Sequence, residues 1–182
     1  MSEHTFGPLR SRAARKPWPE CPDVAVYRCR RCGKLYQELG PLEPQADADK
    51  PPVSGCCGEA LERLVPLSQE DIAPDILVDY KVVGGFNADA VQVFWESAED
   101  RPEWILLKTF TGGYLKYVSP KKVPPLVFPM ADEDAYVYCD REVCQRCVFR
   151  CKRGFVIYLY FKTKGLVEIP LDRMADYFET KA

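Results

Sequence analysis

Histidine is almost absent from this 182-residue sequence, because its one histidine is His4, near the N-terminus. A Ser-His-Asp triad needs one imidazole, and His4 is poorly placed to supply it. An HExxH zinc site, or any other site built from several imidazoles, cannot form within one chain. Chemistry must therefore come from thiolates, carboxylates, lysine, tyrosine or a bound cofactor.

The sequence also lacks an excess of one charge and a long apolar run. Its 25 basic and 27 acidic residues give a net charge of −2, which disfavours electrostatic binding of nucleic acid. The longest apolar run, residues 155–161, is far shorter than the roughly 20 residues that cross a bilayer. Residues 1–20 contain no apolar signal-peptide core. We therefore expect a cytoplasmic protein with no nucleic-acid or membrane partner.

Cysteine, in contrast, is abundant. Eight of the nine cysteines fall into two groups of four, and each group contains a close pair of C-x-x-C type. An odd total with such pairs favours metal sites over a disulfide framework, and a reducing cytoplasm would keep the thiols free to bind metal. The ninth, Cys21, is expected to be an idle or buried thiol. The two groups are Cys29, Cys32, Cys56, Cys57 and Cys139, Cys144, Cys147, Cys151.

Short runs rich in Val, Ile, Tyr, Phe and Trp, separated by Gly, Asn, Asp and Pro, predict a mostly β protein. Seven of these runs follow residue 75 and suggest a β-sandwich. One segment, residues 171–179, has the apolar spacing of a helix. The aromatic residues Trp95, Trp104, Tyr158 and Tyr160 are expected to pack in the core. The predicted strands are residues 24–27, 34–39, 76–83, 90–95, 104–110, 114–118, 135–139, 155–162 and 166–169.

Composition divides the chain into three parts. Residues 1–20 are polar, basic and proline-containing, which predicts a flexible tail. Residues 21–66 contain the first cysteine group and a proline-rich insert, residues 40–54, that indicates an exposed loop. Residues 67–182 contain the remaining strands and the second cysteine group. We predict a small metal domain followed by a β-sandwich domain.

The first cysteine group has the pattern C-x2-C-x23-C-C. Two thiolates from a knuckle and two from a second loop can form a tetrahedral S4 cage, which selects zinc or iron. Glycine on both sides of Cys56 and Cys57 permits the sharp turn that two adjacent ligands need. Spacing alone leaves two interpretations open, a redox-active iron site and a zinc ion that holds a small domain together.

The residues around these cysteines resemble a known family. The segments VYRCRRCG (26–33) and VSGCCGE (53–59) are similar to desulforedoxin and to the N-terminal domain of desulfoferrodoxin. The resemblance implies a rubredoxin-type knuckle, one iron ion held by Cys29, Cys32, Cys56 and Cys57, one-electron transfer, and pairing as a homodimer. The segment between the two cysteine pairs is longer than is usual in that family.

The resemblance extends into the second half of the chain. Residues 91–93, 103–105, 114–117 and 138–139 look like successive strands of the immunoglobulin-like superoxide reductase (neelaredoxin) domain of desulfoferrodoxin. That family binds its catalytic iron with four histidines and one cysteine. Cys139 matches the cysteine, but Glu142 stands where a histidine is expected, and residues 94–100 contain none. We therefore expect the fold without the reductase site, and we assign no catalytic residue.

The second cysteine group, residues 139–151, leaves three alternatives open. Four thiolates within thirteen residues can bind one zinc or iron ion, hold an iron–sulfur cluster, or remain as redox-active thiols. The group is surrounded by basic residues, which either balance the thiolate charge or form a solvated loop. These residues are Arg141, Arg146, Arg150, Lys152 and Arg153.

Three functions are consistent with these patterns. The first is an iron-binding electron-transfer protein with an Fe(Cys)4 centre, fused to a degenerate superoxide reductase-like domain and served by a redox partner protein. The second is a zinc-stapled module for protein interaction. The third is an oxidoreductase that uses the second cysteine group. We expect the first, and we do not expect an ordinary superoxide reductase.

Overall fold

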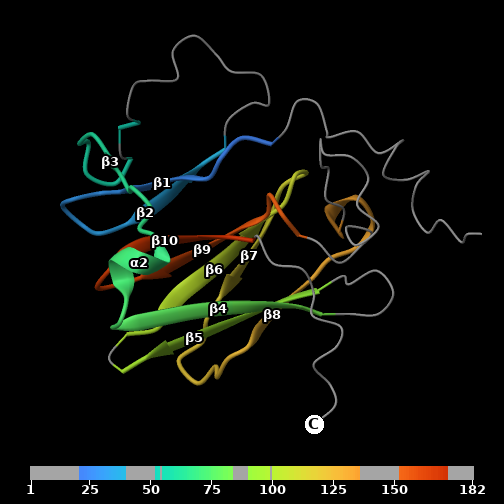
Figure 1. Ribbon diagram of the computed structural model, residues 1–182. Helices are drawn as coiled ribbons and strands as arrows, with labels where there is room; N and C mark the ends of the chain where they lie inside the picture. Colours follow the sequence, from blue (N-terminus) through green and yellow to red (C-terminus); the bar gives the residue numbers. More distant parts are fainter. Residues whose placement is uncertain are drawn as a thin grey trace, which may run out of the picture.

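The computed structural model describes residues 21–39, 52–53, 55–83, 90–98, 100–135 and 152–171. These residues form three antiparallel sheets (Figure 1). A small sheet has the strand order β2-β1-β3, and the other two have the orders β10-β9-β6-β7 and β4-β5-β8. The expectation of a mostly β protein with a sandwich is therefore confirmed.

The small sheet is formed by the first part of the described chain. Its strands are β1 (Ala25–Arg28), β2 (Leu35–Glu38) and β3 (Glu62–Arg63). Strand β1 lies in the middle and pairs with both neighbours, with Tyr27 opposite Tyr36 on one side and opposite Arg63 on the other. The short connection from β1 to β2 contains the first C-x-x-C pair, so the sheet presents that pair at one end.

The two larger sheets form the sandwich. One sheet contains β6 (Pro102–Lys108), β7 (Gly113–Tyr117), β9 (Val156–Phe161) and β10 (Gly165–Pro170). The other contains β4 (Ile76–Val83), β5 (Ala90–Ser97) and β8 (Leu126–Pro129). Their facing sides enclose one cluster of buried side chains. Burial alternates strictly along β4, as period-two geometry requires when the other face meets water.

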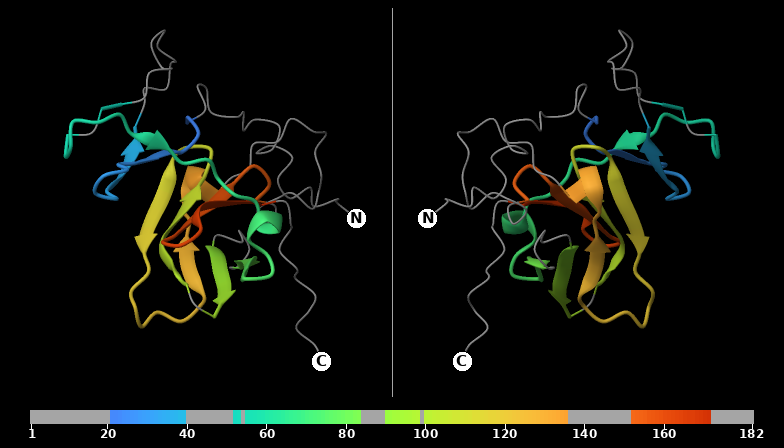
Figure 2. Two further views of the ribbon diagram at one scale, coloured as in Figure 1. Left: turned by 90° about the vertical axis from the view of Figure 1, so that its left-hand side faces the viewer. Right: turned by 90° about the vertical axis from the view of Figure 1, so that its right-hand side faces the viewer.

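Strands β6 and β9 are buried on both faces. Ile105 and Leu159 point into the sandwich core, whereas Trp104, Tyr158 and Tyr160 lie on the opposite face. There they pack against Val26, Val24 and Leu35 of the small sheet, which lies over this face (Figure 2). Trp104 and Tyr160 stack with ring centroids 5.5 Å apart. The predicted core role of the aromatic residues is confirmed, although three of the four pack outside the sandwich core.

An ion pair also ties the two parts together. The buried ammonium group of Lys108, on β6, lies 2.6 Å from a carboxylate oxygen of Asp23, just before β1. The side chain of Asp23 is 84% exposed, so this pair contributes little net stability. It does, however, neutralise the ammonium group of Lys108, which faces the small sheet. The small sheet is thus held mainly by apolar contact.

Several predicted elements differ in the structure. Three elements were not predicted: the two-residue strand β3, the strand β8 and the four-residue helix α2 (Gln69–Ile72), which has a capping box between Ser68 and Asp71. Ala135 was predicted to begin a strand, but it ends a 3₁₀ helix, η1 (Asp132–Ala135). The predictions for residues 1–20, 136–139 and 172–179 lie outside the described residues, as does most of the proline-rich insert.

The remaining strand predictions are confirmed, with ends that agree or shift by at most two residues. The part of the chain that the structure describes contains no helix with the length and hydropathy needed to span a membrane.

Candidate metal centre

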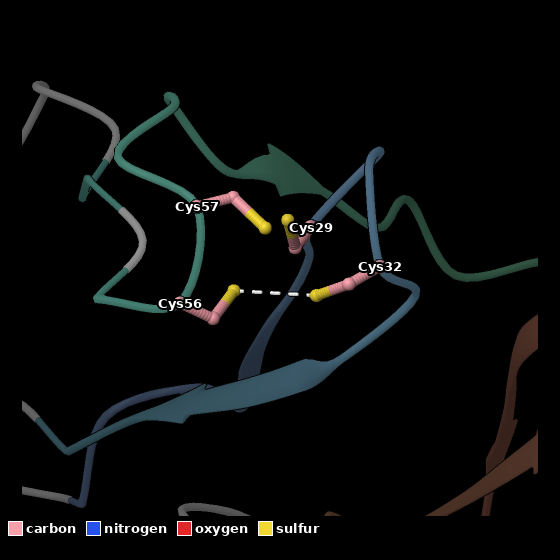
Figure 3. Close-up of side chains that lie close together, drawn as sticks. All are labelled: Cys29, Cys32, Cys56 and Cys57. Atoms are coloured by element: carbon pink, nitrogen blue, oxygen red, sulfur yellow. Dashed lines mark hydrogen bonds between the residues drawn. The ribbon is translucent and has the colours of Figure 1, made fainter.

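Four cysteines converge at one end of the small sheet. Cys29 and Cys32 lie on the turn between β1 and β2, and Cys56 and Cys57 lie on a second turn that precedes β3 (Figure 3). All four Sγ atoms lie within 4.8 Å of one another, and those of Cys32 and Cys56 are 3.3 Å apart. Side chains separated by up to 28 positions therefore point toward a common centre.

The first turn is closed by backbone hydrogen bonds around the cysteine pair. The N–H of Gly33 donates to the carbonyl oxygen of Cys29 at 2.8 Å, and the N–H of Cys29 donates to that of Lys34 at 2.9 Å. Gly33 has a φ of +72°, a left-handed conformation that glycine adopts without strain. The glycine after the C-x-x-C pair therefore turns the chain back into β2.

The second turn ends in the same way. Gly58 follows Cys57 and has a φ of +70°. Val53 and Ala60 form an antiparallel bridge below the turn, and the N–H of Leu61 donates to the carbonyl oxygen of Pro52 at 3.0 Å. Adjacent cysteines cannot point to the same side of an extended strand. A tight turn closed by this bridge allows both to face the first pair.

Burial differs strongly among the four side chains. Cys29 is buried, with 1% of its surface exposed, and packs with Tyr27 and Leu61. Cys56 and Cys57 are half-buried, and Cys32 is exposed. The centre is therefore closed to solvent on the side of Cys29 and open on the side of Cys32.

Local dipoles act on the sulfur atoms. Hydrogen bonding from the backbone N–H groups of Cys32 and then of Arg31 lowers the pKa of the Cys29 thiol, although burial opposes the shift. Burial, together with the neighbouring sulfur atoms, raises the pKa of Cys57 to about 12. The first effect favours a thiolate at Cys29, and the second favours a neutral thiol at Cys57 unless a cation offsets the charge of the thiolates.

Tyr36, on β2, is a residue that sequence reasoning missed. It packs against the small cluster around Cys29, and hydrogen bonding to the sulfur of Cys56 raises the pKa of Tyr36 to about 12. The hydroxyl therefore stays protonated and remains a donor toward that sulfur. The sequence signal that could have identified Tyr36 is the alternation of residues along β2. Tyr36 lies opposite Tyr27, the residue two positions before Cys29, across the sheet.

The donor set fits a metal ion. Tetrahedral coordination with metal–sulfur bonds of about 2.3 Å separates the sulfur atoms by about 3.8 Å. The sulfur atoms of Cys32 and Cys56 are 3.3 Å apart and no pair is more than 4.8 Å apart, so shifts of about 1 Å or less would reach this geometry. Thiolate ligands in a tetrahedral set are typical of zinc and of iron. The four cysteines could thus hold one such ion, and within the described residues they form the one group of this kind.

The other predicted site residues are not brought into this centre. Cys139, Cys144, Cys147 and Cys151 lie outside the described residues. Lys152, which follows that group, is completely buried and donates from Nζ to the carbonyl oxygen of Ala135. The two chain segments that flank the second cysteine group are therefore in contact.

Cys21 lies apart from both groups. Its thiol is half-buried and donates to the carbonyl oxygen of Thr109 at 3.3 Å. The expectation of a thiol without a ligand role is consistent with this position, since the partner is a backbone atom of the sandwich.

Comparison with known proteins supports the fold. No family model and no curated protein sequence matches the chain. Among solved structures, the superoxide reductase from Treponema pallidum is similar, with a TM-score of 0.51 and 16% sequence identity. The likeness covers 81% of this chain and 98% of that one. Identity at this level shows the fold alone, and the chain has a mostly β, superoxide reductase-like fold with a four-cysteine cluster that could bind metal.

Proposed function

We propose that the protein is an iron-binding redox protein that carries single electrons at a centre held by Cys29, Cys32, Cys56 and Cys57. The observation that carries the proposal is the convergence of four thiols from two turns within 4.8 Å. Iron in such a centre supplies one-electron exchange between its ferric and ferrous states. The resemblance of both cysteine turns to the desulforedoxin family favours iron over zinc.

The residues of this chain have distinct parts in the proposal. Cys29, with Tyr27 and Leu61, keeps water from the inner side of the centre. Backbone N–H groups directed at the sulfur of Cys29 stabilise the thiolate form. They therefore favour the more negative charge state of the centre. Cys32 is exposed and provides the shortest route from the centre to a partner at the surface. A four-thiolate cage suits electron exchange, because its shape changes little between the two oxidation states.

The fold likeness does not extend the proposal to superoxide reduction. The sequence holds one histidine, His4, so it cannot supply the four histidine ligands that the superoxide reductase family uses. We therefore propose that the sandwich is a degenerate reductase-like domain that supports the electron-transfer centre through the apolar face of β6 and β9.

Metal analysis with visible spectroscopy tests the proposal. Protein purified without oxygen is expected to contain iron, to show thiolate-to-iron absorption when oxidised, and to bleach on reduction. Cys56→Ser should abolish the absorption, whereas the control Cys21→Ser should retain it, because the Cys21 thiol bonds to a backbone carbonyl. A colourless protein with a full complement of zinc would exclude the proposal.

A zinc-stapled interaction module is a second candidate. The small sheet has few buried residues of its own, with Tyr27, Cys29 and Leu61 forming its cluster. A sheet of this size is typical of domains that a structural metal holds together. This candidate predicts zinc in the centre and no reversible one-electron wave in voltammetry, so the same preparation distinguishes it from an iron protein.

Two expectations from the sequence analysis remain proposals. We propose that the second cysteine group, Cys139, Cys144, Cys147 and Cys151, binds a further zinc or iron ion, which elemental analysis of a Cys144→Ser, Cys147→Ser variant would test. We also propose a homodimer, since the small sheet and the sandwich both have edge strands that pair with no further strand of the described residues. Light scattering measures the mass directly.

A further inference from the structure

The turn that holds Cys29 and Cys32 is rich in basic residues. Four of its seven residues from position 28 to 34 are Arg or Lys, and none is acidic. Three of them surround the exposed ligand Cys32, with Arg30 and Arg31 before it and Lys34 after it. We call these three residues the cationic rim.

The cationic rim is only partly neutralised by the protein. Glu62, on β3, accepts from Arg28 at 3.0 Å and from Arg30 at 3.2 Å, so one carboxylate serves two guanidinium groups. The side chain of Arg30 is 74% exposed, and Arg31 and Lys34 are exposed as well. Within the described residues, neither Arg31 nor Lys34 forms an ion pair. Positive charge therefore remains at the surface beside Cys32.

The two turns of the centre differ in this respect. The turn at Gly55–Glu59 carries no basic residue, and its one charged residue is Glu59. If the basic residues served only to balance the thiolates, both turns would be expected to share them. Their concentration around the exposed ligand places the charge where a second molecule would approach. Surface charges of one sign increase association rates with a partner of opposite sign.

We propose that the cationic rim of Arg30, Arg31 and Lys34 is the docking surface for an acidic redox protein that exchanges electrons through Cys32. This inference rests on the proposed function. The partner is oxidised by one electron and the four-cysteine centre is reduced by one, with no bond formed or broken and no proton transferred. The reverse direction obeys the same balance.

Stopped-flow kinetics with a defined acidic donor tests the docking surface. The probe is reduced plant-type ferredoxin, and the bleaching of the iron-containing protein is followed at increasing ionic strength. The second-order rate constant should fall as salt increases, because screening weakens attraction between exposed charges. At an ionic strength of about 20 mM, Arg31→Glu and Lys34→Glu should each lower the rate constant about threefold to tenfold.

A matched charge reversal provides the control. Lys122 is exposed and lies in the connection between β7 and β8. This connection is at the end of the sandwich remote from the small sheet (Figure 2). Lys122→Glu changes the net charge by the same amount and should leave the rate constant nearly unchanged. Iron content, visible spectrum and midpoint potential of each variant show whether the centre itself is intact, since side-chain changes at positions 31 and 34 retain the backbone N–H groups.

The outcomes separate this inference from the proposed function. If dithionite does not bleach the purified protein, the proposed function fails and the docking surface fails with it. If dithionite bleaches the protein but the ferredoxin rate is independent of salt, or Lys122→Glu slows it as much as Arg31→Glu does, the docking surface alone is refuted. A salt-dependent rate that falls only in the rim variants supports it.

Discussion

The small sheet and the sandwich are both antiparallel β structures, but they are stabilised in different ways. Among the residues that the structure describes, the main cluster of the sandwich contains 23 buried residues, enough for a hydrophobic core. The small sheet has a cluster of three, one of which is a candidate metal ligand. Size alone therefore predicts that the sandwich folds through apolar burial and that the small sheet depends on its metal centre.

The contact between the small sheet and the sandwich is made by buried residues of both. Val26 of β1 packs with Trp104 and Tyr160 on the outer face of the sandwich. This contact holds the small sheet in place but buries only one face of β1. We infer that a metal ion at the four cysteines would replace most of a core in the small sheet, because the sandwich already covers one face of that sheet.

Metal removal should produce the largest difference between the two regions. Stripping the metal with a chelator under reducing conditions is expected to unfold β1–β3, with a loss on the order of 10 kcal/mol of binding energy. Hydrogen exchange followed by mass spectrometry should show fast exchange in residues 25–38 and unchanged protection in residues 76–83 and 156–161. Equal protection of the small sheet with and without metal would contradict the comparison.

Leu159→Ala should destabilise the sandwich and leave the metal content of the small sheet unchanged. Leu159 on β9 is fully buried in the sandwich cluster, and truncation of a buried leucine costs about 2–5 kcal/mol. Urea unfolding followed by tryptophan fluorescence should report this loss. Metal content per folded protein should stay the same, since Leu159 lies on the face of β9 directed away from the small sheet. A variant that folds but loses its metal would show that the two regions are not separable.

Gly33→Ala should have a smaller effect that is confined to the metal turn. A left-handed φ costs a residue with a Cβ about 1 kcal/mol or more, and a Cβ at this position meets no neighbour, so the cost is conformational alone. Gly55→Ala is the matched control, because it lies on the other turn in equally open space at an ordinary φ. In thermal unfolding of the metal-loaded variants, Gly33→Ala should unfold at a lower temperature than Gly55→Ala. Equal unfolding temperatures would refute the conformational argument.

Asp100→Asn should have the smallest effect, and the effect should depend on pH. Burial raises the pKa of Asp100, but hydrogen bonds from the hydroxyl and the N–H of Thr163 outweigh it and hold that pKa below its ordinary value of 3.8. A lowered pKa in the folded state stabilises the protein above pH 3.8, and this contribution is lost as pH falls through the folded-state value.

Urea unfolding at several pH values tests the sign. The variant should be less stable than the wild type at pH 7, and the difference should shrink as the pH falls below 3.8. A difference that grows with acidification would contradict the argument, and the metal turns should be unaffected at neutral pH.

Much of the fold was predictable from sequence because its strands carry a strong local signal. The alternation along residues 76–83 identified β4 with correct ends, and the turn residues between strands marked most boundaries. Strand β8 was missed because prolines at positions 124, 125 and 129 flank a run of only three residues. Helix α2 was missed because four residues show no helical period.

The candidate site was predictable to the level of its ligands. The spacing of the four cysteines and their glycines sufficed to bring Cys29, Cys32, Cys56 and Cys57 together. Sequence could not show which ligand is exposed, because exposure depends on how the turns meet Tyr27 and Leu61. It also did not reveal that the apolar run of β9 is apolar because the small sheet covers its outer face.

X-ray absorption at the iron edge tests the central claim most directly. For the purified protein we predict a shell of sulfur neighbours at about 2.3 Å, the length typical of metal–thiolate bonds. The shell should lose sulfur in Cys57→Ser and remain unchanged in Cys21→Ser. An iron shell of oxygen and nitrogen alone, or an iron-free protein with Cys32 and Cys56 joined in a disulfide, would contradict the account.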